Sequence, residues 1–375
     1  MKLYIIAGEA SGDLHASNLI RSLKQQRSDL EVRGWGGELM QEQGATIAKH
    51  YKDLAFMGFI EVVMNLRTIL GNIRFCKEDI LEYKPDAVVL VDYPGFNLRI
   101  ATFCREQGIP VLYYISPQAW AWKENRVKRI KRDVTRMFCI LPFEKAFYEK
   151  HGMDVDFVGH PLLDVISADD SSSDLRRELG FDPDQKIIAL LPGSRKQEIN
   201  TMLPVMLKVA EKYPDHRFVI AGAPGQEASF YKSVPGTEKV KIVFGKTYQL
   251  FAEAEAGLIT SGTATLEAAL NDLPQVVCYK GSSISYYIAR MLVKIKYISL
   301  VNLIMDQEVV RELIQHEMNE HQIHEELNAL LSDSEKRQQQ LSAYEALRQR
   351  LGGKGASERT AKAMLEVIAS SNTRG

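Results

Sequence analysis

Short apolar runs alternate along this chain with longer amphipathic stretches, and that alternation restricts the fold to few possibilities. A first series of runs spans residues 3–8, 87–92, 110–116, 136–142 and 155–160, and a second spans 186–194, 217–223, 239–245, 256–262 and 274–280. Apolar runs of this length, separated by stretches of helical periodicity, are typical of β-α units around a parallel sheet. Two such series predict an α/β protein with two doubly wound, Rossmann-like domains.

The two series are separated by "ISADDSSSD" at 166–174, which reads as an exposed linker because it is rich in Ser and Asp. We therefore predict domains at 1–165 and 176–335, a count that suits a chain of 375 residues. Residues 336–375 are helical in character, with a Gly-Gly break near 352, and we expect them to pack back on the first domain. Ligands of such sheets bind at the carboxyl ends of the strands, so we expect the two domains to face each other across a cleft.

Composition excludes several classes of protein. Apolar residues make up 45% and charged residues 25% of the chain, as in ordinary globular proteins, and the formal net charge of −1 argues against a general nucleic-acid binder. The four cysteines lie far apart with no CxxC pair, which predicts neither a disulfide framework nor a zinc site. An apolar strand follows Met1 almost at once, without the pattern of a secretory signal, so we expect a cytosolic chain.

Two loops of the first domain follow predicted strands and carry acidic residues. In "GEASGD" at 8–13, backbone N–H groups at the helix start can hold an anion, whereas Glu9 and Ser11 suit sugar hydroxyls or proton transfer. The alternative is a tight β-α turn in which Asp13 complements the helix dipole. In "VDYPGFN" at 91–97, Asp92 lies where such folds place their chemistry, and Asn97 is either a ligand or the cap of the next helix.

Two loops of the second domain suit a diphosphate. "LLPGSR" at 190–195 ends a buried strand and presents Ser194 and Arg195, whose guanidinium matches phosphate oxygens. "ITSGTATLE" at 259–267 places Ser261-Gly262-Thr263 at a helix start and Glu267 one turn further on the same face. Backbone amides and hydroxyls can hold a diphosphate there while Glu267 reaches a ribose. The chain has no GxxxxGK[ST], no GxGxxG after its first strand and no GxSxG, which weakens ATPase, dinucleotide-binding and α/β-hydrolase interpretations.

Three further segments mix apolar, aromatic and basic residues. The segment 54–70 is strongly apolar but too short and too interrupted to span a bilayer, so it is either a buried helix or an exposed helix that receives acyl chains. "SPQAWAWKENRVKRIKR" at 116–132 joins two tryptophans to a basic cluster, which fits either a solvated charged face or a membrane interface. The segment 285–304 has the same ingredients.

The combination of motifs resembles one family over nearly the whole chain. "GEASGD", "DYPGFN", "SPQAWAW", "GHP" at 159–161, "LLPGSR", "SGTATLE" and "LVNLI" at 300–304 occur in the order and spacing of the lipid-A-disaccharide synthases. These enzymes of Gram-negative bacteria are inverting glycosyltransferases of the GT-B fold. The resemblance implies transfer from UDP-2,3-diacylglucosamine to 2,3-diacylglucosamine 1-phosphate, forming a β-1,6-linked disaccharide and UDP. It also implies no metal or other cofactor, no nucleic acid, a peripheral position on the cytoplasmic face of the inner membrane, and a homodimer as a candidate assembly.

The resemblance also assigns roles to residues of this sequence. UDP would be held by the second domain, with the loop at 244–248 as the base pocket, and the acceptor by the first domain, where Glu9 and Asp92 are the candidate catalytic residues. The candidate substrate-binding residues are Ser11, Asp13, Asn97, Gln118, Ser194, Arg195, Ser261, Gly262, Thr263, Glu267 and Asn302.

One position departs from the family pattern. Many relatives carry an Asp, the favoured general base, where this chain has Gly95, so either Asp92 or Glu9 takes the proton or the reaction needs a weaker base than the family pattern implies. Two alternatives stay open. One is a UDP-sugar epimerase or a transferase for a soluble acceptor on the same fold, which burial of 54–70 would favour. The other is a non-catalytic, membrane-peripheral binder of nucleotide sugars, which the missing acid at Gly95 favours.

Overall fold

The computed structural model describes residues 1–54, 66–122, 124–166, 175–281 and 296–372. Its contacts divide the chain into two units: unit 1 comprises Met1–Asp164 and Leu351–Gly375, and unit 2 comprises Val165–Arg350. Most of the predicted linker at 166–174 lies outside the described residues, as do large parts of the apolar segments at 54–70 and 285–304.

Unit 1 is built on one parallel sheet of seven strands in the order β3-β2-β1-β4-β5-β6-β7. The order reverses direction between β1 and β4, so these neighbouring strands form the topological switch point of a doubly wound sheet. The strands are β1 (Lys2–Ala7), β2 (Glu31–Gly36), β3 (Thr46–His50), β4 (Ala87–Val91), β5 (Val111–Tyr114), β6 (Arg136–Cys139) and β7 (Asp156–Phe157).

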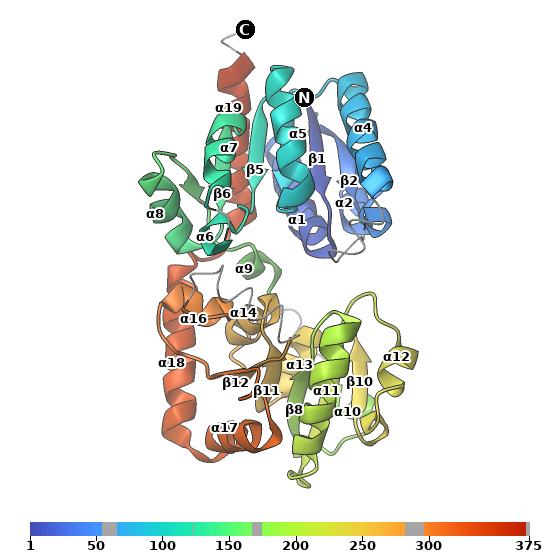
Figure 1. The fold of residues 1–375 in the computed structure, drawn as a ribbon, viewed down its shortest axis with the longest axis vertical. Helices are drawn as coiled ribbons and strands as arrows, with labels where there is room; N and C mark the ends of the chain where they lie inside the picture. The colour runs from blue at the N-terminus through green and yellow to red at the C-terminus, as the bar shows by residue number, and fades with distance from the viewer. Residues whose placement is uncertain (55–65, 123, 167–174, 282–295, 373–375) are drawn as a thin grey trace. The chain divides into compact units, whose positions relative to one another are not determined.

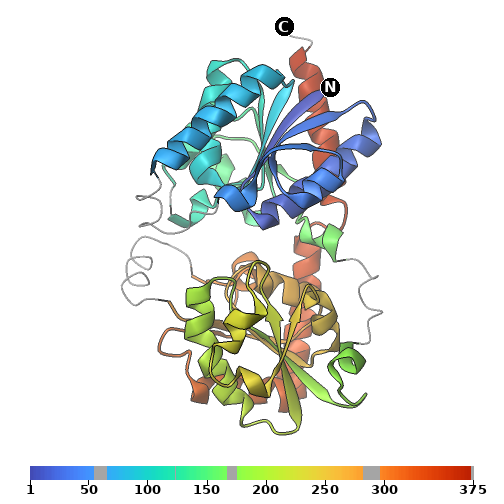
Figure 2. The same cartoon turned by 90° about the vertical axis from the view of Figure 1, so that its right-hand side faces the viewer.

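Helices cover both faces of this sheet (Figures 1 and 2). Alternate strand residues such as Tyr4 and Ile6 are fully buried in one core with helices α4, α5, α7 and α8, as the period of two in a strand requires. On the other side α19 packs along α1. The helices of unit 1, with one 3₁₀ turn η1, are α1 (Ala10–Gln26), α2 (Glu38–Glu42), η1 (Tyr51–Leu54), α4 (Leu66–Tyr83), α5 (Pro94–Glu106), α6 (Ala119–Trp122), α7 (Arg126–Asp133), α8 (Pro142–Lys150), α9 (Leu162–Val165, whose last residue falls in unit 2) and α19 (Ala356–Asn372).

Unit 2 repeats this plan with six parallel strands in the order β10-β9-β8-β11-β12-β13. Its switch point lies between β8 and β11. Separate buried clusters lie on the two faces of the sheet: Ile188 and Leu190 belong to one, Ile187 and Ala189 to the other. The strands are β8 (Lys186–Leu191), β9 (His216–Gly222), β10 (Lys241–Phe244), β11 (Ala256–Thr260), β12 (Gln275–Tyr279) and β13 (Glu312–Ile314).

The C-terminal helices are divided between the units, which corrects one expectation. We expected residues 336–375 to pack together on the first domain, but only α19 does so. Helix α18 packs on unit 2, where the fully buried Tyr344 donates a hydrogen bond to the Leu273 carbonyl. The helices of unit 2, with one 3₁₀ turn η3, are α10 (Leu175–Leu179), α11 (Lys196–Ala210), α12 (Ala228–Lys232), η3 (Thr237–Lys239), α13 (Thr247–Glu253), α14 (Thr263–Leu270), α16 (Leu300–Met305), α17 (Glu320–Ser332) and α18 (Ser334–Arg350).

The ten strands expected from apolar runs are all present, and three more were missed. β2, β3 and β13 contain charged residues such as Arg33, Lys49 and Glu312 and therefore lack a continuous apolar run. β3 and β13 are edge strands with one neighbour, which reduces the apolar surface that they need to bury.

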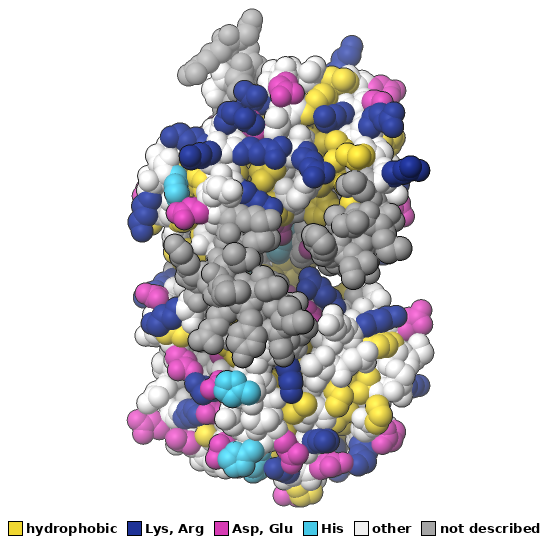
Figure 3. All heavy atoms as spheres, viewed as in Figure 1, with side chains coloured by type: hydrophobic (Ala, Val, Ile, Leu, Met, Phe, Trp, Pro, Cys, Tyr) yellow, Lys and Arg dark blue, Asp and Glu magenta, His cyan; other side chains and the backbone are white. Residues whose placement is uncertain are grey.

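Helix α4 exposes large apolar side chains at the surface of unit 1. Leu70, Phe75 and Leu81 are 54%, 42% and 46% exposed. Figure 3 shows apolar side chains interleaved with Lys and Arg over this part of the unit. No helix among the described residues is both long and apolar enough to cross a membrane.

Two buried histidines make the stability of unit 1 depend on pH. Burial lowers the pKa of His15 to about 4 and that of His160 to about 3. Between these values and the ordinary 6.5 the unfolded chain binds more protons than the folded one, so folding stability falls as the pH drops below 6.5. Wild type should lose stability between pH 7 and pH 5. We expect this loss to be smaller by roughly 2 kcal/mol in His160→Asn, because asparagine does not titrate.

Urea unfolding followed by tryptophan fluorescence measures this loss, since all three tryptophans, Trp35, Trp120 and Trp122, belong to unit 1. Gln107→Asn, an exposed position of the same unit that does not titrate, is the control and should leave the loss as in wild type. Equal losses in wild type and His160→Asn would contradict the prediction.

Candidate functional site

The switch point of unit 1 brings two predicted motifs together. Ala7 of β1 lies beside Val91 of β4, so "GEASGD" and "DYPGFN" leave adjacent strands at the same edge of the sheet. Their contact is close: a Cβ on Gly8 would lie 2.3 Å from the ring of Tyr93. Only glycine fits at position 8 while Tyr93 stays in place.

The backbone at Asp92 is strained, and buried side chains stabilise it through hydrogen bonds. Asp92 and Tyr93 have φ values of +44° and +46°, which non-glycine residues adopt rarely and mostly at functional sites. The Asp92 carbonyl accepts hydrogen bonds from Tyr113 Oη at 2.6 Å and from Asn97 Nδ2 at 2.8 Å. Asn97 is fully buried and also donates to the Val91 carbonyl, so its amide contacts the loop backbone rather than solvent.

The carboxyl group of Asp92 has a raised pKa. Burial, and secondarily the negative charge of Glu9, raise the pKa of Asp92 to about 6. A carboxylate with a pKa near the working pH is a better general base than one at 3.8, because it binds a proton more strongly and is still largely ionised at pH 7. Glu9 is half-buried at the N-cap of α1, within electrostatic reach of Asp92.

The other candidates of the first loop differ in exposure. Ser11 is exposed in the first turn of α1. Asp13 is only 2% exposed, and its carboxylate accepts hydrogen bonds from the backbone N–H groups of Gly37, Leu39 and Met40 at 2.7, 3.1 and 3.2 Å. Asp13 therefore caps the short helix α2, a role that the sequence did not predict, although it also lies in the first turn of α1 as the alternative expected.

The loop after β5 carries Gln118, whose side chain is exposed. Its neighbours Ser116 and Trp120 donate hydrogen bonds to Glu144 of α8, which is only 1% exposed. Glu144 was missed from the sequence because a Glu at the third position of a helix, here α8, is typical of an ordinary helix-capping residue.

The switch point of unit 2 joins the two predicted diphosphate loops. Leu191 of β8 lies beside Ile259 of β11, so "PGSR" and "SGT" leave adjacent strands at one edge. Gly262 caps α14 with a φ of +152°, which favours glycine, and among the described residues no atom beyond its chain neighbours lies within 4 Å of where its Cβ would be. The backbone at this helix start is therefore open to an anion.

Hydrogen bonds at this edge of the sheet fix the conformation of both loops. The Ser194 and Arg195 backbone N–H groups donate to Glu198 Oε2 at 3.1 and 3.2 Å, which fixes the turn, while the Arg195 side chain is 66% exposed. Ser261 Oγ donates to the Ile298 carbonyl at 2.9 Å.

Glu267 lies one turn into α14, and its carboxyl group is partly buried. Burial raises its pKa above the ordinary value, and its side chain makes no hydrogen bond with the residues that the structure describes. A partly buried carboxylate without a donor is suited to accept one from a ligand hydroxyl.

On the expectation from the motif that Glu267 accepts a hydrogen bond from a ribose, Glu267→Gln should weaken UDP binding about ten-fold or more, because a charged acceptor is replaced by a neutral one. Isothermal titration calorimetry with UDP measures the change. Glu345→Gln, at an exposed position on α18 of the same unit, is the matched control. Unchanged affinity in Glu267→Gln would exclude a contact between this carboxylate and the nucleotide.

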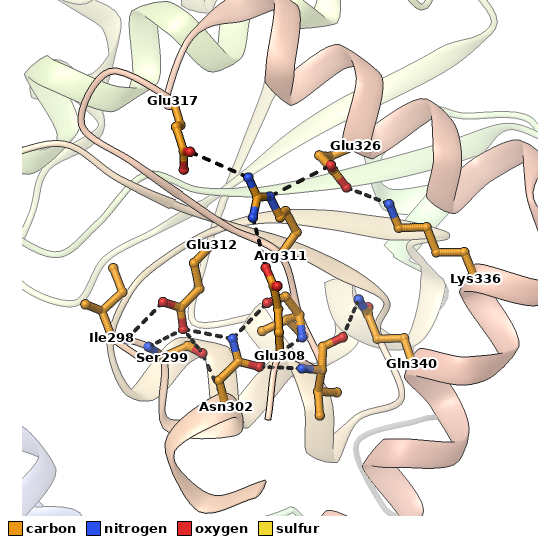
Figure 4. Close-up of polar contacts among 12 residues, drawn as sticks. Ile298, Ser299, Asn302, Glu308, Arg311, Glu312, Glu317, Glu326, Lys336 and Gln340 are labelled. Atoms are coloured by element: carbon orange, nitrogen blue, oxygen red, sulfur yellow. Dashed lines mark hydrogen bonds and ion pairs between the residues drawn. The ribbon is translucent and has the colours of Figure 1, made fainter. Parts of the chain in front are cut away.

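Asn302 is buried in a polar network rather than exposed to ligand (Figure 4). Its amide donates to Glu312 Oε1 and the Val310 carbonyl and accepts from two backbone N–H groups. Glu312 also accepts from the Ser299 backbone and hydroxyl at 2.9 and 2.7 Å and from the Ile298 N–H at 3.0 Å. This network fixes the segment that receives the Ser261 hydrogen bond, and sequence reasoning missed Glu312 because it lies far from any motif.

The predicted base pocket at 244–248 begins at an exposed ring. Phe244, at the end of β10, is 39% exposed and packs on Gly222, where a Cβ would lie 2.2 Å from the ring. A groove of about 990 Å³ in unit 2 lies at the other edge of the sheet, where β9 and β10 begin. None of the predicted site residues lines it, so we assign it no role in this site.

Two doubly wound parallel units, each with its loops gathered at a switch point, define the GT-B fold of nucleotide-sugar enzymes. Solved structures agree on the fold. S. aureus MnaA, solved with UDP, matches with a TM-score of 0.70 at 13% identity over 98% of both chains. CalG4, the calicheamicin glycosyltransferase, matches with a TM-score of 0.63 at 14% identity over 98% of both chains.

Sequence comparisons define the family within this class. A family model described as lipid-A-disaccharide synthetase matches residues 3–367. The lipid-A-disaccharide synthase of Syntrophus aciditrophicus is 40% identical over 378 residues, which cover 98% of each chain. That of Myxococcus xanthus is 37% identical over 374 residues, covering 98% of this chain and 97% of the relative. The chain belongs to the lipid-A-disaccharide synthase family and is a glycosyltransferase, as the motifs predicted.

Proposed function

We propose that this enzyme transfers the sugar of UDP-2,3-diacylglucosamine to the 6-hydroxyl of 2,3-diacylglucosamine 1-phosphate, with inversion and without a metal. The observation that carries the proposal is the family match over residues 3–367. The acceptor oxygen attacks the anomeric carbon, the bond to the diphosphate breaks, and its electron pair leaves with UDP.

Unit 2 is proposed to hold the donor. Gly262 and Thr263 open α14, whose N-terminal dipole stabilises the charge that develops on the diphosphate, and the exposed Arg195 supplies a guanidinium. Ser194 and Ser261 shape the two loops around it, Glu267 accepts from the ribose, and Phe244 offers a face for the base.

Unit 1 is proposed to hold the acceptor. Asp92 takes the proton of the attacking hydroxyl, supported by its raised pKa of about 6, and Glu9 raises that basicity through its charge. The exposed Ser11 and Gln118 bind the acceptor sugar. Asp13, Asn97 and Asn302 are buried, so their side chains do not contact substrate. They affect substrate binding only through the backbone segments to which they hydrogen-bond.

A micelle assay with both purified substrates tests the reaction. Mass measurement should find the disaccharide 1-phosphate, with one UDP released per disaccharide. Conversion of the UDP-sugar alone into an epimer would establish the epimerase alternative instead. Binding of UDP-sugar without turnover would establish the non-catalytic binder.

The substrates carry acyl chains, so we also propose that unit 1 docks on the cytoplasmic face of the inner membrane. The exposed apolar side chains of α4, with Arg67 and Arg74 beside them, support this because interfacial helices combine these residue types. We expect the triple change Leu70→Ser, Phe75→Ser and Leu81→Ser to lower binding to phosphatidylglycerol-containing vesicles about ten-fold, since less apolar surface can be buried.

Vesicle flotation measures this binding. As a control, the triple change Lys232→Ser, Ser233→Ala and Lys241→Ser alters exposed positions of unit 2 and should leave flotation nearly unchanged. Equal flotation of wild type and the α4 variant would contradict docking through this helix.

A further inference from the structure

A buried carboxylate holds the loop after β5. Glu144 Oε1 accepts hydrogen bonds from the Ser116 hydroxyl and from Trp120 Nε1 at 3.3 Å, and its Oε2 accepts from the backbone N–H groups of Ile140 and Leu141 at 3.2 and 2.9 Å. All four partners are donors, which is the arrangement that an ionised carboxylate requires. Two of its bonds cap its own helix, and the other two hold Ser116 in the loop and Trp120 in α6, the short helix that follows the loop.

Two more side chains of α8 contact the same loop. The ring of Phe143 meets that of Trp120 edge to face, with centroids 4.9 Å apart and planes at 84°. Tyr148, fully buried, has its hydroxyl 3.5 Å from the Pro117 carbonyl. Helix α8 therefore clamps this segment through three side chains, those of Phe143, Glu144 and Tyr148.

The clamped loop begins with a strained residue. Ile115 has a φ of +63°, a genuine outlier for a β-branched side chain, and its N–H donates to the Phe138 carbonyl at 3.0 Å. Such a conformation persists only where the surroundings over-determine it, and strained residues are also found at Asp92 and Tyr93, immediately after the neighbouring strand β4.

The loop lies beside the proposed base. β5 pairs with β4, and the Asp92 N–H donates to the Tyr114 carbonyl at 3.1 Å, immediately before the loop. Within the loop Gln118 is exposed, whereas Ser116 is buried and bonded to Glu144.

We propose that Glu144 is a positioning residue for the acceptor: by fixing Ser116 and Trp120 it sets where the exposed Gln118 meets the acceptor sugar beside Asp92. This inference rests on the proposed function of the same site. Misplacement of a substrate-binding group by about 1 Å can cost as much as 100-fold in rate, so loss of the clamp should be measurable although Glu144 itself touches no substrate.

The clamp should respond to pH. Burial raises the pKa of Glu144 to about 7, and a protonated carboxyl would present an O–H to one of its four donors. The other titratable groups that face it are the thiol of Cys139 on β6 and the hydroxyl of Tyr148, and burial raises the pKa of both, away from neutrality. Between pH 6 and pH 8 only Glu144 among these groups changes charge.

The test compares Glu144→Gln with Glu149→Gln, an exposed position on the same helix. In the micelle assay we expect kcat/KM for the acceptor to fall about 10- to 100-fold in Glu144→Gln, mainly through KM, while UDP affinity and the Glu149→Gln variant stay as in wild type. A ¹⁹F resonance of 5-fluorotryptophan at Trp120 should titrate near pH 7 in wild type and not in Glu144→Gln.

Trp120→Phe and Ser116→Ala keep Glu144 on its own helix and remove only the donors of the loop, so they test the clamp even where Glu144→Gln unfolds. Each should raise the acceptor KM several-fold with little change in melting temperature. A wild-type acceptor KM in both variants would overturn the positioning role. A wild-type enzyme that makes no disaccharide would instead overturn the proposed function, and the two failures are therefore distinct.

Discussion

Asp92→Asn should lower kcat for disaccharide formation by about 100- to 10,000-fold, the usual contribution of a positioned general base. Asparagine keeps the shape of the side chain but cannot take a proton, so UDP affinity and the acceptor KM should change little. In wild type kcat should fall as the pH drops through about 6, where Asp92 becomes protonated, and this limb should be absent from the residual activity of the variant. Steady-state kinetics between pH 5 and pH 8 measure both effects.

Substitutions at Gly95 give a second test of Asp92 as the general base. Gly95 occupies the first turn of α5 and is exposed, and no atom of the described residues outside its own turn lies within 4 Å of where its Cβ would be, so an aspartate fits there without a clash with that part of the chain. We expect Gly95→Asp to recover part of the activity lost in Asp92→Asn, because it returns a carboxylate to the same loop, whereas Gly95→Asn should not. A wild-type kcat in Asp92→Asn would exclude Asp92 as the base and leave Glu9 as the candidate.

Gly34→Ala should destabilise unit 1 by more than about 3 kcal/mol. Gly34 of β2 pairs with Ile5 of β1, and an alanine Cβ would lie 1.8 Å from the Ile5 carbonyl oxygen and 2.8 Å from its carbonyl carbon. Both are backbone atoms of the neighbouring strand, so no side-chain rotation relieves the clash and the two strands must separate. Urea unfolding followed by tryptophan fluorescence measures the loss, because the tryptophans belong to unit 1.

The matched control is Gly71→Ala in α4 of the same unit, where no atom of the described residues outside the helix's own backbone lies within 4 Å of the added Cβ. Because alanine favours helix over glycine, this change should be neutral or stabilise unit 1 by up to about 1 kcal/mol. Equal stability of Gly34→Ala and wild type would show that the two strands can part at little cost.

Residue patterns predicted the loops of the candidate site better than the direction of its side chains. Asp92, Glu9, Arg195 and Glu267 were expected at the ends of strands or one helical turn beyond them, and they lie there. Asp13, Asn97 and Asn302 belong to the same motifs, yet their side chains turn inward to bind backbone. A motif identifies a segment, whereas the direction of one side chain depends on which distant backbone groups need a partner.

The sequence by itself determined the order of the β-α units, their grouping into two sheets and the family, because apolar periodicity and motif spacing are local properties of the chain. Only the tertiary structure decided which loops became neighbours at the two switch points, since strand order depends on packing between segments far apart in sequence. It also decided that α18 packs on unit 2 and α19 on unit 1. The tertiary structure also decided the roles of the buried carboxylates of Glu144 and Glu312, because each accepts hydrogen bonds from donors in other segments of the chain.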